Sequence, residues 1–272
     1  MKSRQWAATP PRGPLDRLAR RPYPAAVASL ADIRSRSSWG NICEGQLQHA
    51  GLAVLLTVGA LSLLAAPAEA PTLLRLTSAG WAHLSIALAL VHQVIVALGF
   101  RLQLHRNLLT RLLGDRDMAV WRAVFMPLLL TRPVTVLLTG WADTTPVTGH
   151  RAPEILLGAA LLGLSGWALH SVLVHFTLTR ALGGDHFREE IARLPLVRGG
   201  IYRHTQNAMY GVAFLGLWGI ALALGSWNAL VVALFQHCYI WVHMYCTEKP
   251  DMEWIYGHCP ELQPGGSAAT EP

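Results

Sequence analysis

Charged residues are scarce in this chain: they make up 14% of its 272 residues, while 52% of the residues are apolar. Soluble domains carry about 25% charged residues. A soluble globular fold is therefore not expected, and the long apolar runs predict a membrane bundle instead. Helices rather than barrel strands are expected, because the runs are continuous and every backbone group in lipid must be paired internally.

Paired cysteines and regularly spaced metal ligands are also lacking. None of the four cysteines belongs to a C-x-x-C pair, so neither a structural zinc site nor a disulfide framework is expected. Six histidines lie in the apolar runs without metal-ligand spacing and with few carboxylates beside them, which predicts ordinary hydrogen-bonded histidines and no metal. They are His83, His92, His170, His175, His237 and His243.

The chain shows no internal repeat, although transporters often consist of two related halves. Its net charge of +6 does not indicate nucleic-acid binding, because the arginines lie between apolar runs, where membrane topology accounts for them. Four regions are expected: a polar, basic N-terminal tail at 1–48, N-terminal membrane spans at 49–150, a membrane core at 151–258 and a flexible C-terminal tail at 259–272.

Six apolar segments are long enough, or nearly so, to cross a bilayer, since a spanning helix needs roughly 20 residues with a range of about 17–25. The fold class expected is all-α: a polytopic integral membrane bundle of about six transmembrane helices. Only Ser226 and Trp227 separate the last two segments, which predicts a C-terminal helical hairpin. The segments are 50–66, 80–100, 118–141, 155–178, 209–225 and 228–246.

Arginines are distributed unequally between the two sides that this topology defines. The segments between spans on the N-terminal side hold nine of them, and the opposite loops hold Arg75 and Arg151. The positive-inside rule therefore places the arginine-rich side in the cytoplasm. The nine are Arg101, Arg106, Arg111, Arg116, Arg180, Arg188, Arg193, Arg198 and Arg203.

Arg132 lies inside the third span, where Arg132-Pro133 is expected to interrupt the helix. An arginine near the bilayer centre costs at least about 2.5 kcal/mol, so its side chain must face the bundle or water. Two interpretations remain open. Arg132 contacts a lipid phosphate or a cofactor carboxylate, or backbone carbonyls beside a proline kink satisfy it.

The most informative stretch lies between Gly163 and Gly257. It contains the small-residue segment 163–166, then 182–187 (LGGDHF) and 200–211 (GIYRHTQNAMYG), and, after the hairpin, 247–252 (TEKPDM). The hairpin returns the chain to the membrane face that it left, so Glu248 is expected near the polar segment that precedes the fifth span. This arrangement predicts a pocket open to lipid and water, suited to a soluble cofactor and a lipid substrate.

In this order the motifs resemble the membrane methyltransferase superfamily of phosphatidylethanolamine N-methyltransferases and isoprenylcysteine carboxyl methyltransferases. That pattern has a Gly-Pro-Tyr-Arg-type lead, Arg-His-Pro-x-Tyr or Asn-Pro-x-Tyr, a helical hairpin, and Glu-Glu followed by Pro. Asn207 and Tyr210 give the Asn form, which points to the phospholipid branch. The resemblance covers roughly 155–257. The chain departs from the pattern at Ala208 for Pro, Lys249 for the second Glu and Ser165 for Gly.

The resemblance implies N-methylation of phosphatidylethanolamine or its methylated intermediates towards phosphatidylcholine, with S-adenosylmethionine as the cofactor and a bilayer phospholipid as the partner. It also implies an active site that faces the cytoplasm, in the endoplasmic reticulum of a eukaryote or the inner membrane of a bacterium. Alternatives are methylation of a prenyl-cysteine carboxylate or a small thiol, an NADPH-dependent membrane reductase, and a non-catalytic relative.

The resemblance also assigns roles to single residues. Asn207, Tyr210 and His204 are the catalytic candidates, and Arg203 is a substrate-binding one. Arg132 is a second substrate-binding candidate because of its charge inside the third span, not because of the resemblance. Other interpretations stay open: Asn207 as a helix N-cap, Tyr210 as an interfacial anchor and Arg203 as a topology marker. The base that deprotonates the amine is His204, Glu248, Asp251 or the lipid phosphate. Cofactor binding is assigned to Gly163, Leu164, Ser165, Tyr202, Glu248 and Lys249, and the cofactor carboxylate or a phosphate to Arg203 or Arg198.

Overall fold

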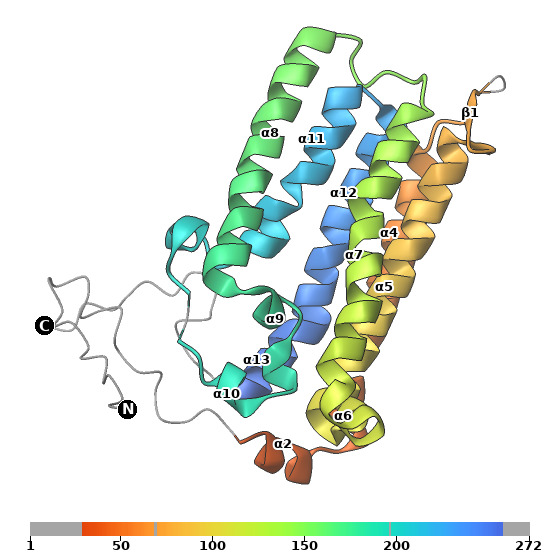
Figure 1. The fold of residues 1–272 in the computed structure, drawn as a ribbon. Coiled ribbons are helices and arrows are strands. Elements are labelled where there is room, and N and C mark those ends of the chain that lie inside the picture. Colours follow the sequence, from red (N-terminus) through yellow and green to blue (C-terminus); the bar gives the residue numbers. More distant parts are fainter. Residues whose placement is uncertain (1–28, 68–69, 196, 258–272) are drawn as a thin grey trace, which may run out of the picture.

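A computed structural model describes residues 29–67, 70–195 and 197–257, and it shows an all-α bundle of long helices (Figure 1). The long helices are α4 (Gln46–Leu63), α5 (Ser78–Arg106), α7 (Asp117–Trp141), α8 (Arg151–Ser171), α11 (Leu215–Leu224) and α12 (Trp227–His243). Short helices are α2 (Leu30–Arg36), α3 (Trp39–Cys43), α6 (Leu108–Leu113), α9 (Leu178–Ala181), α10 (Glu189–Ala192) and α13 (Lys249–Tyr256).

Five helical stretches are long and apolar enough to cross a membrane, and a sixth apolar stretch, Ala208–Leu224, is shorter. The prediction of an all-α, polytopic membrane bundle is confirmed. The predicted fifth span is the short one, and it forms the expected antiparallel hairpin with α12. The five long stretches are Trp39–Leu63, Ser78–Arg106, Leu108–Trp141, Arg151–Phe176 and Trp227–Tyr256.

Large apolar side chains cover much of the bundle's outer surface. Leu55 on α4, Leu130 on α7 and Leu156 on α8 are 66%, 57% and 73% exposed. A soluble protein seldom exposes contiguous apolar area on this scale, whereas lipid solvates such side chains without cost. The exposed faces are therefore lipid-facing, and the buried faces hold small residues such as Gly158 and Gly219, whose backbones meet between α8 and α11.

The third span is one continuous helix, α7, although Pro127 and Pro133 lie inside it. The expectation that Arg132-Pro133 interrupts the span is therefore wrong. Hydroxyl groups of neighbouring threonines bond to carbonyls around the prolines: Thr131 Oγ1 donates to the Leu128 carbonyl at 2.6 Å and Thr135 Oγ1 to the Thr131 carbonyl at 2.7 Å. These are not the carbonyls that the prolines leave free, which belong to residues 123 and 129. The packing of neighbouring helices makes proline tolerable in a membrane helix.

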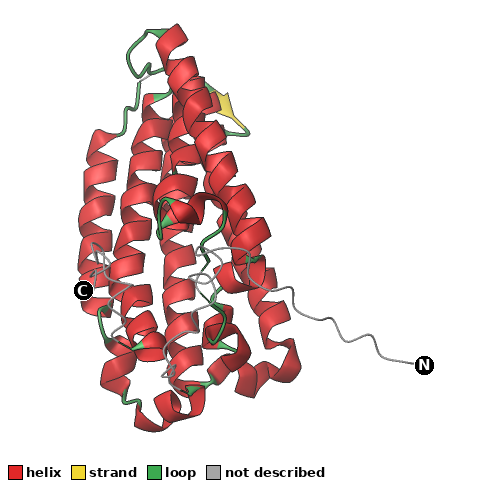
Figure 2. Ribbon diagram, turned by 90° about the vertical axis from the view of Figure 1, so that its left-hand side faces the viewer, coloured by secondary structure: helices red, strands yellow, loops and turns green. Residues whose placement is uncertain are grey.

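The two ends of the bundle differ in structure (Figures 1 and 2). At the end that we call the hairpin end, β1 (Thr72–Leu73) and β2 (Leu76–Thr77) form a two-stranded antiparallel ribbon, and Gly225 turns α11 into α12. The other end, which we call the arginine-rich end, carries α2, α6, α9, α10 and α13. The arginines predicted to share one side of the membrane lie in or next to these elements.

Non-α helical turns gather towards the arginine-rich end. Three π-helical segments occur among the described residues, each at the end or the start of a spanning helix. Such segments are rare and are frequent at functional sites. They are η2 (Val172–Phe176), η5 (Ala208–Ala213) and η6 (Met244–Glu248). Short 3-10 turns also lie here: η1 (Gly114–Arg116), η3 (Gly184–His186) and η4 (Gly200–Arg203).

Candidate active site

The first wall of the candidate site is the end of α8, where the helix passes into η2. Thr177 follows η2 with φ 75° and ψ 144°, a backbone region that a β-branched residue rarely adopts. The loop 197–204 packs against this end. A Cβ on Gly199 would lie 2.6 Å from the His175 ring, and one on Gly200 would lie 2.4 Å from Ser171 Oγ. Only glycine permits this approach, which sets Ile201 and Tyr202 under α8.

Tyr202 is buried in this wall, and its ring stacks on Phe176 with the centroids 5.5 Å apart. Burial raises the pKa of its phenol to about 12. Its hydroxyl is buried and has no hydrogen-bond partner among the described residues. A buried phenol without a partner loses free energy, so this hydroxyl is a group that a bound molecule would satisfy.

The small-residue segment of α8 presents two different faces. Ser165 is buried and donates a hydrogen bond to the Ala213 carbonyl of η5 at 2.7 Å. Gly163 and Leu164 are exposed, and a Cβ on Gly163 would meet nothing within 4 Å. Residues two apart on a helix point in nearly opposite directions, so Gly163 and Ser165 do not line one surface. Ser165 docks η5 on α8, and Gly163 leaves open space on the other side.

The segment η5 begins at Asn207, which occupies the N-cap position without a side-chain cap hydrogen bond. Asn207 is thus the N-cap by position, as the alternative interpretation expected, but its side chain makes no capping bond. Its carbonyl instead accepts the first bond of the segment, from Gly211 N at 2.9 Å. Ala208, which stands where the family pattern has proline, is fully buried against α8. The π-helical turn then directs Tyr210 towards η6.

Tyr210 and Glu248 meet across the hairpin, 38 residues apart in sequence. The Tyr210 hydroxyl donates a hydrogen bond to Glu248 Oε2, and Nε2 of the buried His243 lies 3.3 Å from Glu248 Oε1. The Glu248 side chain stays 20% exposed. The structure thus confirms that the hairpin delivers Glu248 to the segment before the fifth span, and it adds His243 as a third member.

A buried cluster of charges lies beside this triad. Asp251 is fully buried, with Arg101 Nη1 3.0 Å from its Oδ1 and His186 Nε2 3.2 Å from its Oδ2. His186 Nδ1 also lies 2.9 Å from Asp185 Oδ1, and Tyr256 donates to Asp185 Oδ2 at 2.9 Å. Since every oxygen of Asp251 faces a cation or an imidazole in the interior, Asp251 is not available as the base for a substrate amine.

Two opposing effects set the pKa values of this cluster: burial disfavours the charged forms, and pairing with an opposite charge favours them. Burial disfavours the charged form of His186, but the carboxylates of Asp185 and Asp251 outweigh it and raise its pKa to about 10. Burial would raise the pKa of Asp185, and contact with His186 and Tyr256 lowers it overall. His186 is therefore a cation at neutral pH, held between two carboxylates.

Arg132 lies deeper in the bundle, with only 3% of its surface exposed. Its Nε donates to His92 Nδ1 at 3.2 Å, its Nη1 donates to Gln236 Oε1 at 3.3 Å, and its guanidinium lies 5.6 Å from the centre of the Phe214 ring. Side chains, and not the backbone carbonyls of a kink, are thus its partners. Its Nη2 is buried without a partner among the described residues.

The remaining predicted residues lie at the surface of the site. Arg203 and His204 are exposed, and the His204 ring contacts Trp167 of α8 edge-on with the centroids 5.7 Å apart. Lys249 is exposed at the start of α13. Arg203 and His204 precede Tyr210 in the chain and Lys249 follows Glu248, and the contacts of Arg132 within the described part of the chain do not include any of the three.

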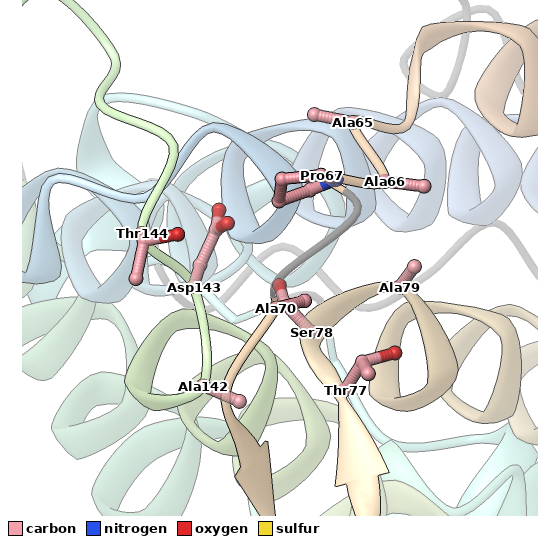
Figure 3. Close-up of a pocket in the computed structure, with 10 residues that line it drawn as sticks. All are labelled: Ala65, Ala66, Pro67, Ala70, Thr77, Ser78, Ala79, Ala142, Asp143 and Thr144. Atoms are coloured by element: carbon pink, nitrogen blue, oxygen red, sulfur yellow. The ribbon is translucent and has the colours of Figure 1, made fainter.

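A cavity of about 210 Å³ lies at the opposite, hairpin end (Figure 3). Its lining is mostly alanine and threonine. The carboxylate of Asp143 accepts hydrogen bonds from Ser226 Oγ at 2.6 Å and Asn228 N at 2.9 Å. Among the described residues that line this cavity, Asp143 is the one charged side chain, and these hydrogen bonds engage its carboxylate.

Sequence analysis missed His243, Asp185, His186 and Arg101 as parts of the site. His243 was expected to be an ordinary intramembrane histidine, although it precedes Glu248 by five residues, which is the spacing of one π-helical turn. Asp185 and His186 stood in a quoted motif without a role. No local signal marked Arg101, since its partner Asp251 is 150 residues away.

Comparison with known proteins places the similarity in this half of the chain. Residues 153–259 match the family model described as phospholipid methyltransferase. The matched stretch contains η2, η5, η6 and α13, and it excludes α4, α5 and α7.

Curated relatives carry the name phosphatidylethanolamine N-methyltransferase. That of Scheffersomyces stipitis is 32% identical over 74 residues, 27% of this chain and 9% of the relative. Those of Candida albicans and Clavispora lusitaniae are 30% and 29% identical over 106 and 109 residues, 38% and 39% of this chain and 12% of each relative. The chain thus matches about a tenth of the length of these relatives. No solved structure matches.

Proposed function

We propose that this chain transfers a methyl group from S-adenosylmethionine to the amine of phosphatidylethanolamine or of its methylated intermediates. The similarity to phospholipid methyltransferases over residues 153–259 supports the reaction class. The observation that carries the proposal is the contact of Tyr210, His243 and Glu248 where the hairpin returns to the arginine-rich end. It joins the motif before the fifth span and the motif after the sixth at one partly exposed carboxylate.

Glu248 is the residue that we expect to bind the cationic part of the cofactor. Its carboxylate is negatively charged and 20% exposed, and Tyr210 fixes one of its oxygens. The buried hydroxyl of Tyr202, which has no partner among the described residues, also fits a bound molecule. Gly163 lies on the face of α8 opposite to Ser165 and η5, so its assignment to the cofactor rests on the resemblance alone. When bound, S-adenosylmethionine would supply an electrophilic methyl group next to its positively charged sulfur. Leu164 and Lys249 have no contact that singles them out for this role.

The substrate amine needs to be neutral and aligned with the methyl group. Positioning supplies much of the rate in such a displacement. Asn207 and Tyr210 lie at the start of η5, where the headgroup would meet the cofactor. Glu248 Oε1 and His243 Nε2 are the paired groups that could accept the amine proton, with His204 as an exposed alternative. Because Asp251 is engaged in the interior, the candidates for the base are Glu248, His243, His204 and the lipid phosphate.

Two arginines are proposed to hold the lipid phosphate. Arg203 is exposed at the aqueous face, which suits a headgroup arriving from the bilayer surface. Arg132 has one free buried donor, Nη2, and lies against Phe214, four residues beyond Tyr210. An intramembrane arginine with an unpaired donor marks a functional site more often than a scaffold. Arg203 is the contact that we expect during each turnover.

The orientation that we propose places the arginine-rich end in the cytoplasm, where the methyl donor is made available. The segments at that end carry most of the arginines between spans, in agreement with the positive-inside rule. The membrane is that of the endoplasmic reticulum for a eukaryotic chain and the inner membrane for a bacterial one. The part 151–258 is then the catalytic core, and 49–150 are supporting spans.

The test is methyl transfer from radiolabelled S-adenosylmethionine into lipid extracts by membranes that contain the full chain. We expect label in methylated phosphatidylethanolamine, lowered ~100-fold by Glu248→Gln, because a charged binding group at the reacting centre is lost. Glu253→Gln is the matched control, since Glu253 is exposed on α13 and outside the site. Label in a small thiol or a prenyl-cysteine, with none in lipid, would overturn the proposal.

A further inference from the structure

Pro250, two residues after the end of the glutamate-bearing segment η6, removes one backbone donor from the helix. In a regular α-helix the Cys246 carbonyl would accept a hydrogen bond from the N–H of residue 250. Residue 250 is Pro250, which has no N–H and whose ring collides with the carbonyl four residues earlier. The chain is π-helical at this place. The Cys246 carbonyl is therefore turned towards donors outside its own helix.

The donors come from the N-terminal half of the chain. Arg101 Nη2 on α5 and Gln46 Nε2 at the start of α4 both donate to the Cys246 carbonyl, each at 3.4 Å. Gln46 Nε2 also donates to Thr247 Oγ1 at 3.2 Å. Both residues lie outside the matched range 153–259, so the similarity to known methyltransferases says nothing about them.

The Arg101 side chain contacts both the segment around Glu248 and the N-terminal segment before α4. Its side chain is 1% exposed, and its guanidinium reaches the Asp251 carboxylate at 3.0 Å, the Glu44 carbonyl at 3.0 Å and the Asn41 carbonyl at 3.3 Å. The same planar fork thus binds the carbonyl two residues before Glu248 and the carboxylate three residues after it. A lysine ammonium, with its compact charge, cannot span both positions.

Gly45 lets the N-terminal segment approach η6 this closely. A Cβ at this position would lie 2.2 Å from the Cys246 carbonyl oxygen, a backbone atom that cannot move aside alone. Its φ of +74° also lies in the left-handed region that favours glycine. Two independent constraints therefore require glycine where the N-terminal half meets the segment that carries Glu248.

We propose that Arg101 is a positioning residue for Glu248, and that the N-terminal helices thereby complete the methyl-donor site. Arg101 binds the Cys246 carbonyl before Glu248 and the Asp251 carboxylate after it. These two contacts fix the position and direction of the Glu248 side chain at the arginine-rich end. Gly45 permits the approach, and Gln46 supports it. What Glu248 binds rests on the proposed function. That Arg101 and Gly45 hold η6 in place rests only on the contacts above.

The experiment compares Arg101→Lys and Gly45→Ala with the control Gly51→Ala in the full-length protein in lipid nanodiscs. Gly51 lies on α4 as well, and a Cβ there would meet nothing within 4 Å. Amide hydrogen exchange measures residues 244–251 and, as internal reference, 215–229. We expect faster exchange at 244–251 in the first two variants, unchanged exchange at 215–229, and no change in Gly51→Ala. Unchanged exchange at 244–251 in Arg101→Lys would overturn the proposal.

Equilibrium dialysis with S-adenosylmethionine tests the consequence for binding. Arg101→Lys and Gly45→Ala are expected to raise Kd about tenfold, because a binding group held loosely loses preorganisation. The same substitutions in a Glu248→Gln background are expected to add nothing, since they act through Glu248. Equal losses in both backgrounds would show a role unrelated to Glu248 and overturn the proposal.

The two measurements separate the two proposals. A wild-type chain that binds no S-adenosylmethionine contradicts the proposed function, and hydrogen exchange then decides alone whether Arg101 and Gly45 hold η6. A chain that methylates lipid with unchanged exchange in Arg101→Lys supports the function and refutes the role of Arg101.

Discussion

The two ends of the bundle handle buried polar groups in opposite ways. At the hairpin end, Asp143 caps α12, and Asn228 exchanges hydrogen bonds of 2.8 and 2.9 Å with the backbone of Ala65 and donates to Ser78 at 3.1 Å. At the arginine-rich end, Asp251 is paired with Arg101 and His186. The hairpin end uses helix caps, an amide and the local pair of Arg151 and Glu154, three residues apart on α8, whereas the arginine-rich end uses ion pairs between segments that are distant in sequence.

This difference separates scaffold from site. Neutral caps satisfy helix ends at small cost, because they use the backbone groups that every helix leaves open. Buried ion pairs lose hydration and seldom add stability over an apolar core. The arginine-rich end keeps long-range ion pairs beside the partly exposed Glu248 and the π-helical segments. Their place beside the candidate site indicates a role other than stability.

The largest expected effect compares the two buried aspartates. Asp251→Ala leaves Arg101 buried without its carboxylate partner and is expected to cost about 3–5 kcal/mol of unfolding free energy. Asp143→Ala removes a helix cap and is expected to cost about 1–2 kcal/mol. Thermal unfolding in detergent measures both. Equal losses would mean that the two ends are stabilised in the same way.

The pH dependence of stability sharpens the same comparison. The pKa of His186 is raised from its usual 6.5 to about 10. Its contribution to the free energy of unfolding is therefore fully present below about pH 6.5 and is lost as the pH rises through about 10. The groups facing it are Asp185, Asp251, Arg101 and His105. We expect the Tm to fall between pH 7 and 10, and His186→Gln to remove most of that fall. If the Tm of the wild type and that of His186→Gln fell equally with pH, this prediction would be contradicted.

Two glycines on α8 test where the helix faces protein and where it faces a ligand. A Cβ on Gly158 would lie 2.9 Å from backbone atoms of α11, so Gly158→Ala is expected to cost about 1–3 kcal/mol by overpacking. Gly163→Ala meets open space and is expected to leave stability unchanged. If Gly163 borders the cofactor, the alanine variant raises the KM for S-adenosylmethionine. An unchanged KM would remove Gly163 from the site.

Tyr210→Phe is the mildest test of the site. The variant keeps the ring and loses the hydrogen bond to Glu248, so methyl transfer is expected to fall about tenfold, with stability changed by about 1 kcal/mol or less. Tyr245→Phe is the matched control, since Tyr245 is 49% exposed on the same hairpin. Activity unchanged in Tyr210→Phe would reduce Tyr210 to the interfacial anchor that its position also permits.

The spans and the sidedness of the arginines were predictable, and the pairing of buried charges was not. Apolar segments 80–100 and 118–141 correspond to α5 and α7 because a spanning helix is read from local length and hydropathy. The partners of Arg132 were missed, since His92 and Gln236 lie 40 and 104 residues away. The predicted break at Pro133 was wrong because packing against neighbouring helices supports a proline within a membrane helix.

The candidate site was predicted in part. The order of the motifs and the helical hairpin predicted that Glu248 lies near the segment that contains Tyr210. The structure shows the two side chains in contact. Ser165, assigned to the cofactor by resemblance, bonds to η5 on the side of α8 opposite to Gly163, and its role towards the cofactor stays a prediction. His243 became visible only through the π-helical turn of η6, which places it beside Glu248.

The sequence by itself determined that this chain is an all-α membrane bundle, which segments are long enough to span, and which motifs resemble phospholipid methyltransferases. These properties depend on runs of neighbouring residues, and hydrophobic length adds up along the chain. Only the tertiary structure decided that Arg101 pairs with Asp251, that Arg132 bonds to His92 and that Gly45 meets Cys246. Such pairs depend on the rotation and register of packed helices, which are set by many contacts at once and leave no mark in any single stretch.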